Sequence, residues 1–284
     1  MTAAERTHAE RLRSCDGYFP PDSIVRRLGN TPLTPMLGGG AAVLLQVAHP
    51  LVAVGVADHS DYHRDLWQRL ARTLRALYLI AFGTREEAER AGAAVQAVHA
   101  HVHGRTALPL GPFPAGTQYS AKDPELQLWV HATLVYASLS IYQRSERQLS
   151  PAEQERYYGE MALVAQLFGT PAEVIPPTLA AFWDYFDAQV ASPVITVTPI
   201  AAEIAGVILD APLPRALRLF APAHRLATAA QLPPRLRDEY GLRWTPLRNL
   251  ALPHALRAVK VATKPALRAA SWIAPPPKVL AAGV

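Results

Sequence analysis

Apolar residues recur along this chain mainly at the three- and four-residue spacing of amphipathic helices, and these segments begin at capping residues. Thr84 with Glu87 has the spacing of a capping box, and Asp123 followed by Pro124 opens another helix. Further starts of this kind occur at Ser150, Thr178 and Thr198. Only the stretch SPVITVTP is dense in β-branched residues, and it is short enough to be a linker. The pattern predicts an all-α fold.

The length of 284 residues, half of them hydrophobic, suits one domain with a substantial core. Residues 1–37 combine a short polar helix with a proline-rich approach, so we expect an N-terminal segment that wraps over the surface. Residues 38–284 are then a single helical domain, whose most informative motifs lie in 38–190.

An apolar run over residues 38–57 is about the length of a membrane span, which needs ~20 residues. Gln46, His49 and Pro50 interrupt it. These residues favour a buried helix that is kinked at the proline, and no transmembrane segment. A kink frees backbone carbonyls and often forms a pocket wall, so His49 either lines a pocket or is bonded locally.

The net charge of +5 and the isoelectric point near 9.5 come from basic residues spread along the chain, with no run of five or more. Without a basic patch and interleaved aromatic residues, we expect no nucleic-acid partner. The balance suits an anionic cofactor or weak attraction to acidic lipid. The lone Cys15 excludes an internal disulfide, and the N-terminus has no apolar export signal, so we expect a cytoplasmic protein.

Most of the histidines lie between residues 38 and 104. In the segment VHAHVHG, His99 is at the edge of an apolar helical stripe and His101 points away from it. His99 and His103 have the i, i+4 spacing at which two imidazoles converge on one metal ion, although the sequence has no adjacent glutamate or metal-binding cysteine. A core histidine bonded to a backbone carbonyl is the competing interpretation of His99.

Two further helices place polar groups where apolar neighbours predict burial. Arg69 and Thr73 share a face with leucines, and Arg72 lies beside them. A buried guanidinium needs an anion, such as the carboxylate of a cofactor; alternatively the arginines extend into solvent. His131 lies in the apolar helix PELQLWVHATL, where it is a second candidate ligand, a partner that orients the first, or a satisfied core histidine.

Several ordered motifs together resemble one family, the haem-dependent rubber oxygenases (latex-clearing proteins) and the related MpaB-type oxygenases. The resemblance lies in LLQVAHPLVAVGVADHS, in R-L-A-R-T followed by an aliphatic stretch and FG, in V-x-x-V-H-A-x-V-x-G, and in DPELQLWVHATL. It implies a helical bundle that encloses haem b, with His99 as the iron ligand and Arg69 and His131 as further cofactor-binding residues. Arg72 and Thr73 of the motif are candidate catalytic groups, and His49, at the kink, is a candidate beside Arg72 for a distal hydrogen bond.

The chain departs from the family's R-x-x-K-T motif, because Arg72 stands where the rubber enzymes have a lysine. An arginine keeps its proton, so we expect it to hydrogen-bond a ligand or a propionate and not to coordinate iron. No glutamate lies upstream of Arg69 in the position of the rubber enzymes' proposed base. Cleavage of polyisoprene by that route is therefore not expected.

The resemblance thus predicts a haem b oxygenase that acts with O₂ on a small apolar substrate, for example an unsaturated, isoprenoid-like molecule. A non-catalytic helical protein that binds haem or another hydrophobic ligand is the main alternative. A non-haem metal enzyme that uses His99, His103 and His131 is a third hypothesis. The oligomeric state stays open.

Overall fold

A computed structural model describes residues 10–11, 16–31, 33–60, 66–210 and 215–269. In chain order its elements are α2 (Ile24–Gly29), α3 (Leu33–Val47), α4 (Pro50–His59), α5 (Leu66–Phe82), α6 (Arg85–His101), β1 (His103–Arg105), β2 (Gln118–Ser120), α7 (Pro124–Ser145), α8 (Pro151–Leu167), η1 (Ala172–Val174), α9 (Leu179–Ala191), α10 (Pro199–Leu209), η2 (Arg215–Phe220), α11 (Ala221–Gln231), α12 (Pro234–Glu239) and α13 (Pro246–Ala269). The all-α prediction is confirmed.

The predicted helix starts are confirmed by their caps. The Thr84 hydroxyl accepts from the Glu87 N–H while the Glu87 carboxylate accepts from the Thr84 N–H, which completes a capping box at the start of α6. The same reciprocal pair opens α8 at Ser150 and Glu153. Asp123 caps α7, with Pro124 in the first turn. These bonds join residues close in sequence, so the helix boundaries do not depend on tertiary packing.

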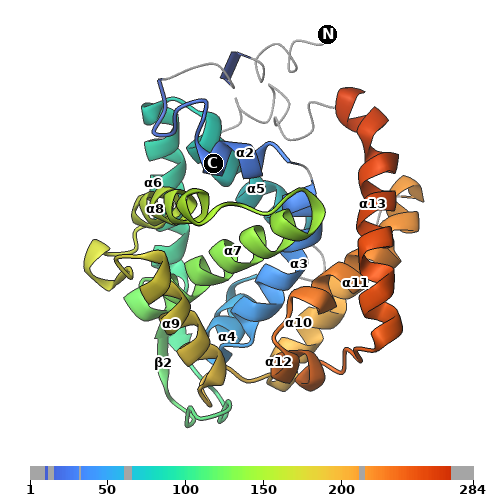
Figure 1. Ribbon diagram of the computed structural model, residues 1–284. Coiled ribbons are helices and arrows are strands. Elements are labelled where there is room, and N and C mark those ends of the chain that lie inside the picture. The colour runs from blue at the N-terminus through green and yellow to red at the C-terminus, as the bar shows by residue number, and fades with distance from the viewer. Residues whose placement is uncertain (1–9, 12–15, 32, 61–65, 211–214, 270–284) are drawn as a thin grey trace.

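Helix α7 runs through the middle of the molecule, with α3 and α8 packed along it (Figure 1). Its Trp129 is 1% exposed, stacks on Phe186 of α9 at a centroid distance of 5.8 Å and donates to the Leu45 carbonyl of α3. Tyr136, two turns on, stacks on the same phenylalanine. An interior position was expected for this helix, because it is apolar around most of its circumference.

Helices α3 and α4 divide the apolar run at the histidine–proline pair and meet at 105°. Within the part of the chain that the structure describes, no single helix is long and apolar enough to cross a membrane, although α3 and α4 taken together have the length. Helix α3 begins at Leu33, so the boundary expected after residue 37 falls inside it. Phe19, Ile24 and Leu28 contribute to the same core as α7 and do not merely cover it.

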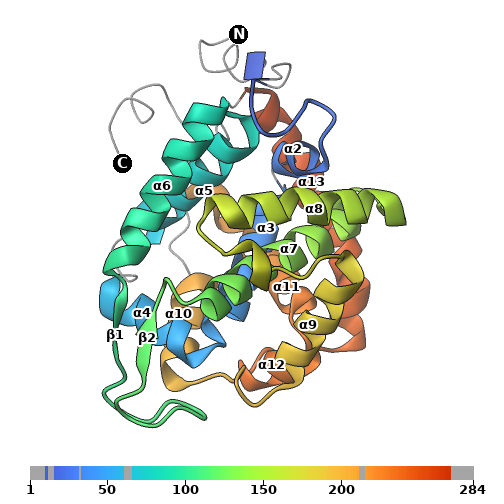
Figure 2. The same ribbon diagram turned by 90° about the vertical axis from the view of Figure 1, so that its left-hand side faces the viewer.

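Helices α5 and α6 lie side by side along one flank of the molecule (Figure 2). Helix α5 also packs against α2, and α6 packs against α8. Beyond α6 the chain forms a small antiparallel pair, β1 with β2. Helix α6 ends at His101, and Gly104 lies in β1 although a glycine at such a place often ends a helix.

Candidate functional site

His131 on α7 is the most isolated polar side chain of the interior. It is 5% exposed, and neither of its ring nitrogens has a hydrogen-bond partner among the described residues. Burial lowers the pKa of the imidazole from 6.5 to about 4, so the ring is neutral at physiological pH. A neutral imidazole with a free lone pair is the form that ligates a metal. The sequence correctly predicts that His131 lies inside the bundle.

A second buried polar atom lies on the same stripe of α7. Gln127, one turn before His131, has a buried Oε1 without a hydrogen-bond partner in the described structure. Farther along the stripe, Leu134 packs against Ala41 and Ala42 of α3, and Ser138 lies beside Tyr157 of α8. The stripe therefore faces the space between α3 and α8. Sequence analysis missed Gln127, although its spacing of four residues from His131 on an apolar helix was a usable signal.

Three buried polar atoms without a partner lie within about one turn of α7, on Gln127 and His131. Leaving a buried donor or acceptor unsatisfied costs about 1–3 kcal/mol, and native interiors contain few such groups. The pair Gln127 and His131 offers a carbonyl oxygen and two imidazole nitrogens within one turn of helix. This donor set fits a cofactor that needs a neutral imidazole ligand.

His99 is half-buried near the end of α6, where sequence analysis places the iron ligand. Three residues earlier, Gln96 donates to the Leu167 carbonyl at 3.0 Å and ties this part of α6 to the end of α8. Gly92 makes the close approach possible, because a Cβ there would lie 2.4 Å from the same carbonyl oxygen. Helix α8 thus supports both the helix of His99 and the helix of His131.

The other two histidines of the VHAHVHG segment are exposed. The His101 ring is bonded to the Ala97 carbonyl at 2.9 Å, on the outer side of α6. His103 lies in β1, beyond the helix. Among the described residues no three His, Cys, Asp or Glu side chains lie close enough to hold a metal ion. The proposed non-haem site of His99, His103 and His131 is therefore not formed.

Helix α5 carries the arginine and threonine motif, and part of that motif is exposed to solvent. Arg72 and Thr73 are exposed, while Arg75, one turn beyond, is half-buried and was not singled out from the sequence. The side chain of Arg69 lies outside the described residues. The exposed guanidinium of Arg72 lies on this flank of the molecule, where it could meet an anionic group such as a carboxylate.

His49 is the N-cap of α4 at the bend between α3 and α4. Its Nδ1 accepts from the Leu51 N–H at 3.2 Å, which places the proton of the neutral ring on Nε2. The ring stacks on Phe113 at 5.6 Å, and burial lowers its pKa to about 4 despite the nearby Asp123. Of the two interpretations, local bonding is thus observed, and Nε2 remains the one nitrogen that can serve a pocket.

At its other end, α4 is fastened to the small sheet. Tyr119 of β2 donates to Asp58 at 2.6 Å, and His59 lies 3.3 Å from the same hydroxyl. Gly104 lets the tyrosine ring lie flat against β1, since a Cβ at that position would be 2.6 Å from the Tyr119 hydroxyl oxygen. The last glycine of the histidine motif is therefore required by packing and not by a helix end.

The fold and these groups define a class first: an all-α protein whose central helix carries a buried neutral imidazole suited to a cofactor. A family model described as ER-bound oxygenase mpaB/B′/rubber oxygenase, catalytic domain, matches residues 26–261. The chain belongs to this family. Family membership establishes an oxygenase-type domain, which implies O₂ and an apolar substrate, and it confirms the resemblance found in the sequence.

Two relatives share most of this length. The uncharacterised proteins Rv2237 of Mycobacterium tuberculosis and Mb2261 of Mycobacterium bovis are each 26% identical over 234 residues, which cover 81% of this chain and 89% of theirs. No solved structure matches the chain.

Proposed function

We propose that this protein is a haem b-dependent oxygenase that uses O₂ to oxidise an apolar substrate, for which an unsaturated, isoprenoid-like molecule is a suitable class. The observation that carries the proposal is the buried, neutral and partnerless imidazole of His131, beside Gln127, in a domain of this oxygenase family. Buried polar groups without a partner are rare in protein interiors, and a cofactor would give this imidazole one.

The residues that would hold haem divide into two kinds. His99 is the proposed iron ligand because it occupies the histidine of the H-A-x-V-x-G motif, and His131 is the alternative ligand because its nitrogens are free. Arg72 and Arg69 on α5 are the proposed partners of the propionates. The haem iron would supply the activation of O₂.

The remaining candidate residues would contact the substrate and not the haem. Thr73 and His49 Nε2 are proposed hydrogen-bonding groups near the reacting molecule, while the apolar residues of α3 and α4 exclude water. Arg72 retains its positive charge throughout, so it positions an anionic or polar partner and transfers no proton.

An absorption spectrum of the protein purified with haem supplied tests the proposal. We expect a Soret band in the wild-type protein, and its loss in the variant that removes the true ligand, His99→Ala or His131→Ala. His101→Ala is the matched control, because this exposed ring lies two residues from His99 on the same helix. A folded wild-type protein that binds no haem would overturn the proposal.

Oxygen uptake distinguishes catalysis from simple haem binding. The haem-loaded protein should consume O₂ when an apolar polyene is added, in proportion to product formed. A stable haem complex that consumes no O₂ with any isoprenoid tested would favour the alternative of a non-catalytic haem-binding protein.

A further inference from the structure

The positive charge of the chain is concentrated toward its C-terminal end, although no run of five or more basic residues occurs there. Residues 211–284 contain twelve Lys and Arg against two Asp and Glu, whereas residues 1–210 contain sixteen against twenty-one. The first three quarters of the protein are thus acidic overall, and the last quarter is strongly basic. Such an asymmetry within one domain predicts a surface that meets an anionic partner.

Helix α13 carries part of this charge and forms one edge of the molecule (Figure 1). Leu252, Leu256 and Val259 on its inner side are buried in a core cluster with α11 and α7. Its outer side is also apolar, which is unusual for a helix on the surface of a soluble domain. Three large side chains there are exposed: Leu247 at 75%, Leu250 at 68% and Val261 at 60%.

These three residues form one stripe. Around a helix of 3.6 residues per turn, positions 247, 250 and 261 lie within about 60° of one another. Arg257 shares the stripe and is exposed. Among the described residues no acidic side chain pairs with Arg257 or with Arg248, at the beginning of the helix. The outer side of α13 therefore combines exposed aliphatic groups with the positive charge of Arg257. Arg248 lies about 100° around the helix from Leu247, toward α11.

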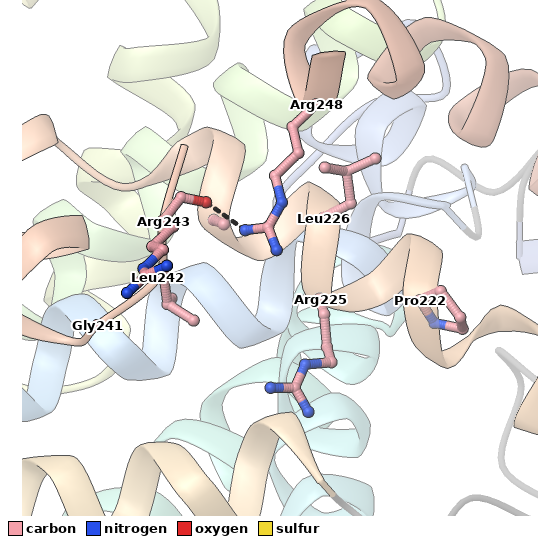
Figure 3. Close-up of a pocket in the computed structure, with 8 residues that line it drawn as sticks. Pro222, Arg225, Leu226, Gly241, Leu242, Arg243 and Arg248 are labelled. Atoms are coloured by element: carbon pink, nitrogen blue, oxygen red, sulfur yellow. Dashed lines mark hydrogen bonds between the residues drawn. The ribbon is translucent and has the colours of Figure 1, made fainter. Parts of the chain in front are cut away.

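A pocket of about 460 Å³ adjoins the start of this stripe. Arg225 from α11, Arg243 from the turn before α13 and Arg248 from α13 line it (Figure 3). Leu226 and Leu242 provide apolar walls. Arg248 donates to the backbone carbonyl of Arg243, which holds its guanidinium in place, and Arg225 pairs with Asp210 at the surface. Arg243 and Arg248 have no carboxylate partner among the described residues, so a hollow that they line beside Arg225 suits a phosphate group.

We propose that this surface binds membranes that contain anionic lipid. The pocket takes a lipid phosphate headgroup, and the leucines of α13 enter the boundary between headgroups and acyl chains. The guanidinium groups would meet the anionic headgroups, and the neighbouring exposed leucines would meet the start of the acyl chains. The proposal does not depend on the haem or on the oxygenase reaction.

A nucleic acid would match the charge but not the apolar groups. Proteins that bind single strands stack bases on exposed aromatic rings, whereas the exposed large apolar side chains of the described residues are all Leu or Val. Trp244, which follows the pocket residue Arg243, is half-buried, and the Arg237 guanidinium covers its ring at 4.9 Å. Aliphatic groups favour a lipid partner.

Co-sedimentation of the full-length protein with lipid vesicles tests this proposal. We expect binding to phosphatidylcholine vesicles that contain about 30% phosphatidylglycerol at about 0.15 M salt, and much weaker binding to phosphatidylcholine alone. Arg248→Glu and Arg257→Glu should each lower the partition coefficient at least about fivefold, since each basic residue near an anionic surface contributes about that factor. The double variant Leu247→Ser, Leu250→Ser should also lower the partition coefficient. If the surface recognised charge alone, this variant would bind vesicles like the wild type.

Two control variants are matched to these changes. Arg90→Glu makes the same charge change at an exposed position of α6, on the opposite flank, and Leu108→Ser removes an equally exposed leucine, 70% accessible, from the loop before β2. Both should bind vesicles like the wild type. Equal binding to neutral and anionic vesicles, no binding, or equal losses in the controls would overturn the proposal. The proposal would also be overturned if the protein bound a DNA duplex more tightly than the anionic vesicles and the leucine substitutions did not weaken that binding.

Discussion

At position 131, burial determines both the charge of the imidazole and its readiness to bind a partner. The ring has no hydrogen bond, so its low pKa of about 4 arises from desolvation alone. His49 reaches a similar pKa while its ring is stacked and bonded as a helix cap. Two buried histidines thus carry different roles, and only the pattern of bonds around each ring separates them.

The apoprotein should lose stability in acid through His131. Its folded pKa of about 4 lies below the ordinary 6.5, so the unfolded chain takes up a proton more readily. Stability is therefore complete above about pH 6.5 and falls as the pH decreases toward 4, by up to roughly 3 kcal/mol. In His131→Leu this loss should be much reduced, and at pH 7 the apoprotein should be at least as stable as the wild type, because an unsatisfied group is removed.

Urea unfolding of the apoproteins at pH 7 and pH 4.5 measures the effect. His101→Leu is the control, because the ring at 101 is exposed and its removal should leave the pH dependence unchanged. An identical acid sensitivity in the wild type and His131→Leu would show that the imidazole is hydrated or bonded in solution.

At the scale of elements, the bend between α3 and α4 depends on one residue with two possible roles. His49 caps α4 through Nδ1, and Pro50 begins the helix with the backbone geometry that its ring imposes. The cap uses Nδ1 and leaves Nε2 outside that bond. A substitution can therefore separate the capping role from a catalytic one.

His49→Asn should retain the cap, since an asparagine side chain accepts the same backbone N–H, whereas His49→Ala should lose about 1 kcal/mol of stability. If Nε2 also serves the reaction, both variants should bind haem but turn over substrate more slowly. Thermal melts and steady-state rates on the same samples distinguish the roles. Full activity of His49→Asn would restrict His49 to capping.

For the whole molecule, the cofactor is expected to contribute to stability. Helices α5 and α6 lie on one flank, and the proposed haem ligands belong to α6 and α7, so a bound cofactor would connect the flank to the centre. Any ligand that binds only the folded state stabilises it by mass action.

Haem in hundredfold excess over its dissociation constant should add about 2.7 kcal/mol to the free energy of unfolding. The denaturation midpoint, measured with and without haem, gives this difference directly. The increment should disappear in the variant that lacks the axial ligand and persist in His101→Ala. An unchanged midpoint in a wild-type sample that shows a Soret band would mean that haem binds the unfolded chain equally well.

The sequence by itself determined the helices, because capping boxes, prolines and apolar spacing act within a few residues of one another. Thr84 with Glu87, Asp123 with Pro124 and the break at Pro50 all lie where these local rules place them. The interior position of His131 followed from its apolar neighbours on the same helix. None of these features needs a distant part of the chain.

Only the tertiary structure decided which polar groups find partners and which apolar faces are covered. Among the described residues it left both nitrogens of His131 unbonded and placed His103 in no three-residue metal site, and it began α3 before the expected boundary. It also buried one side of α13 and exposed the other, although both sides carry leucine and valine. The physical reason is that hydrogen bonding and burial depend on residues brought from elsewhere in the chain, which spacing along one helix does not specify.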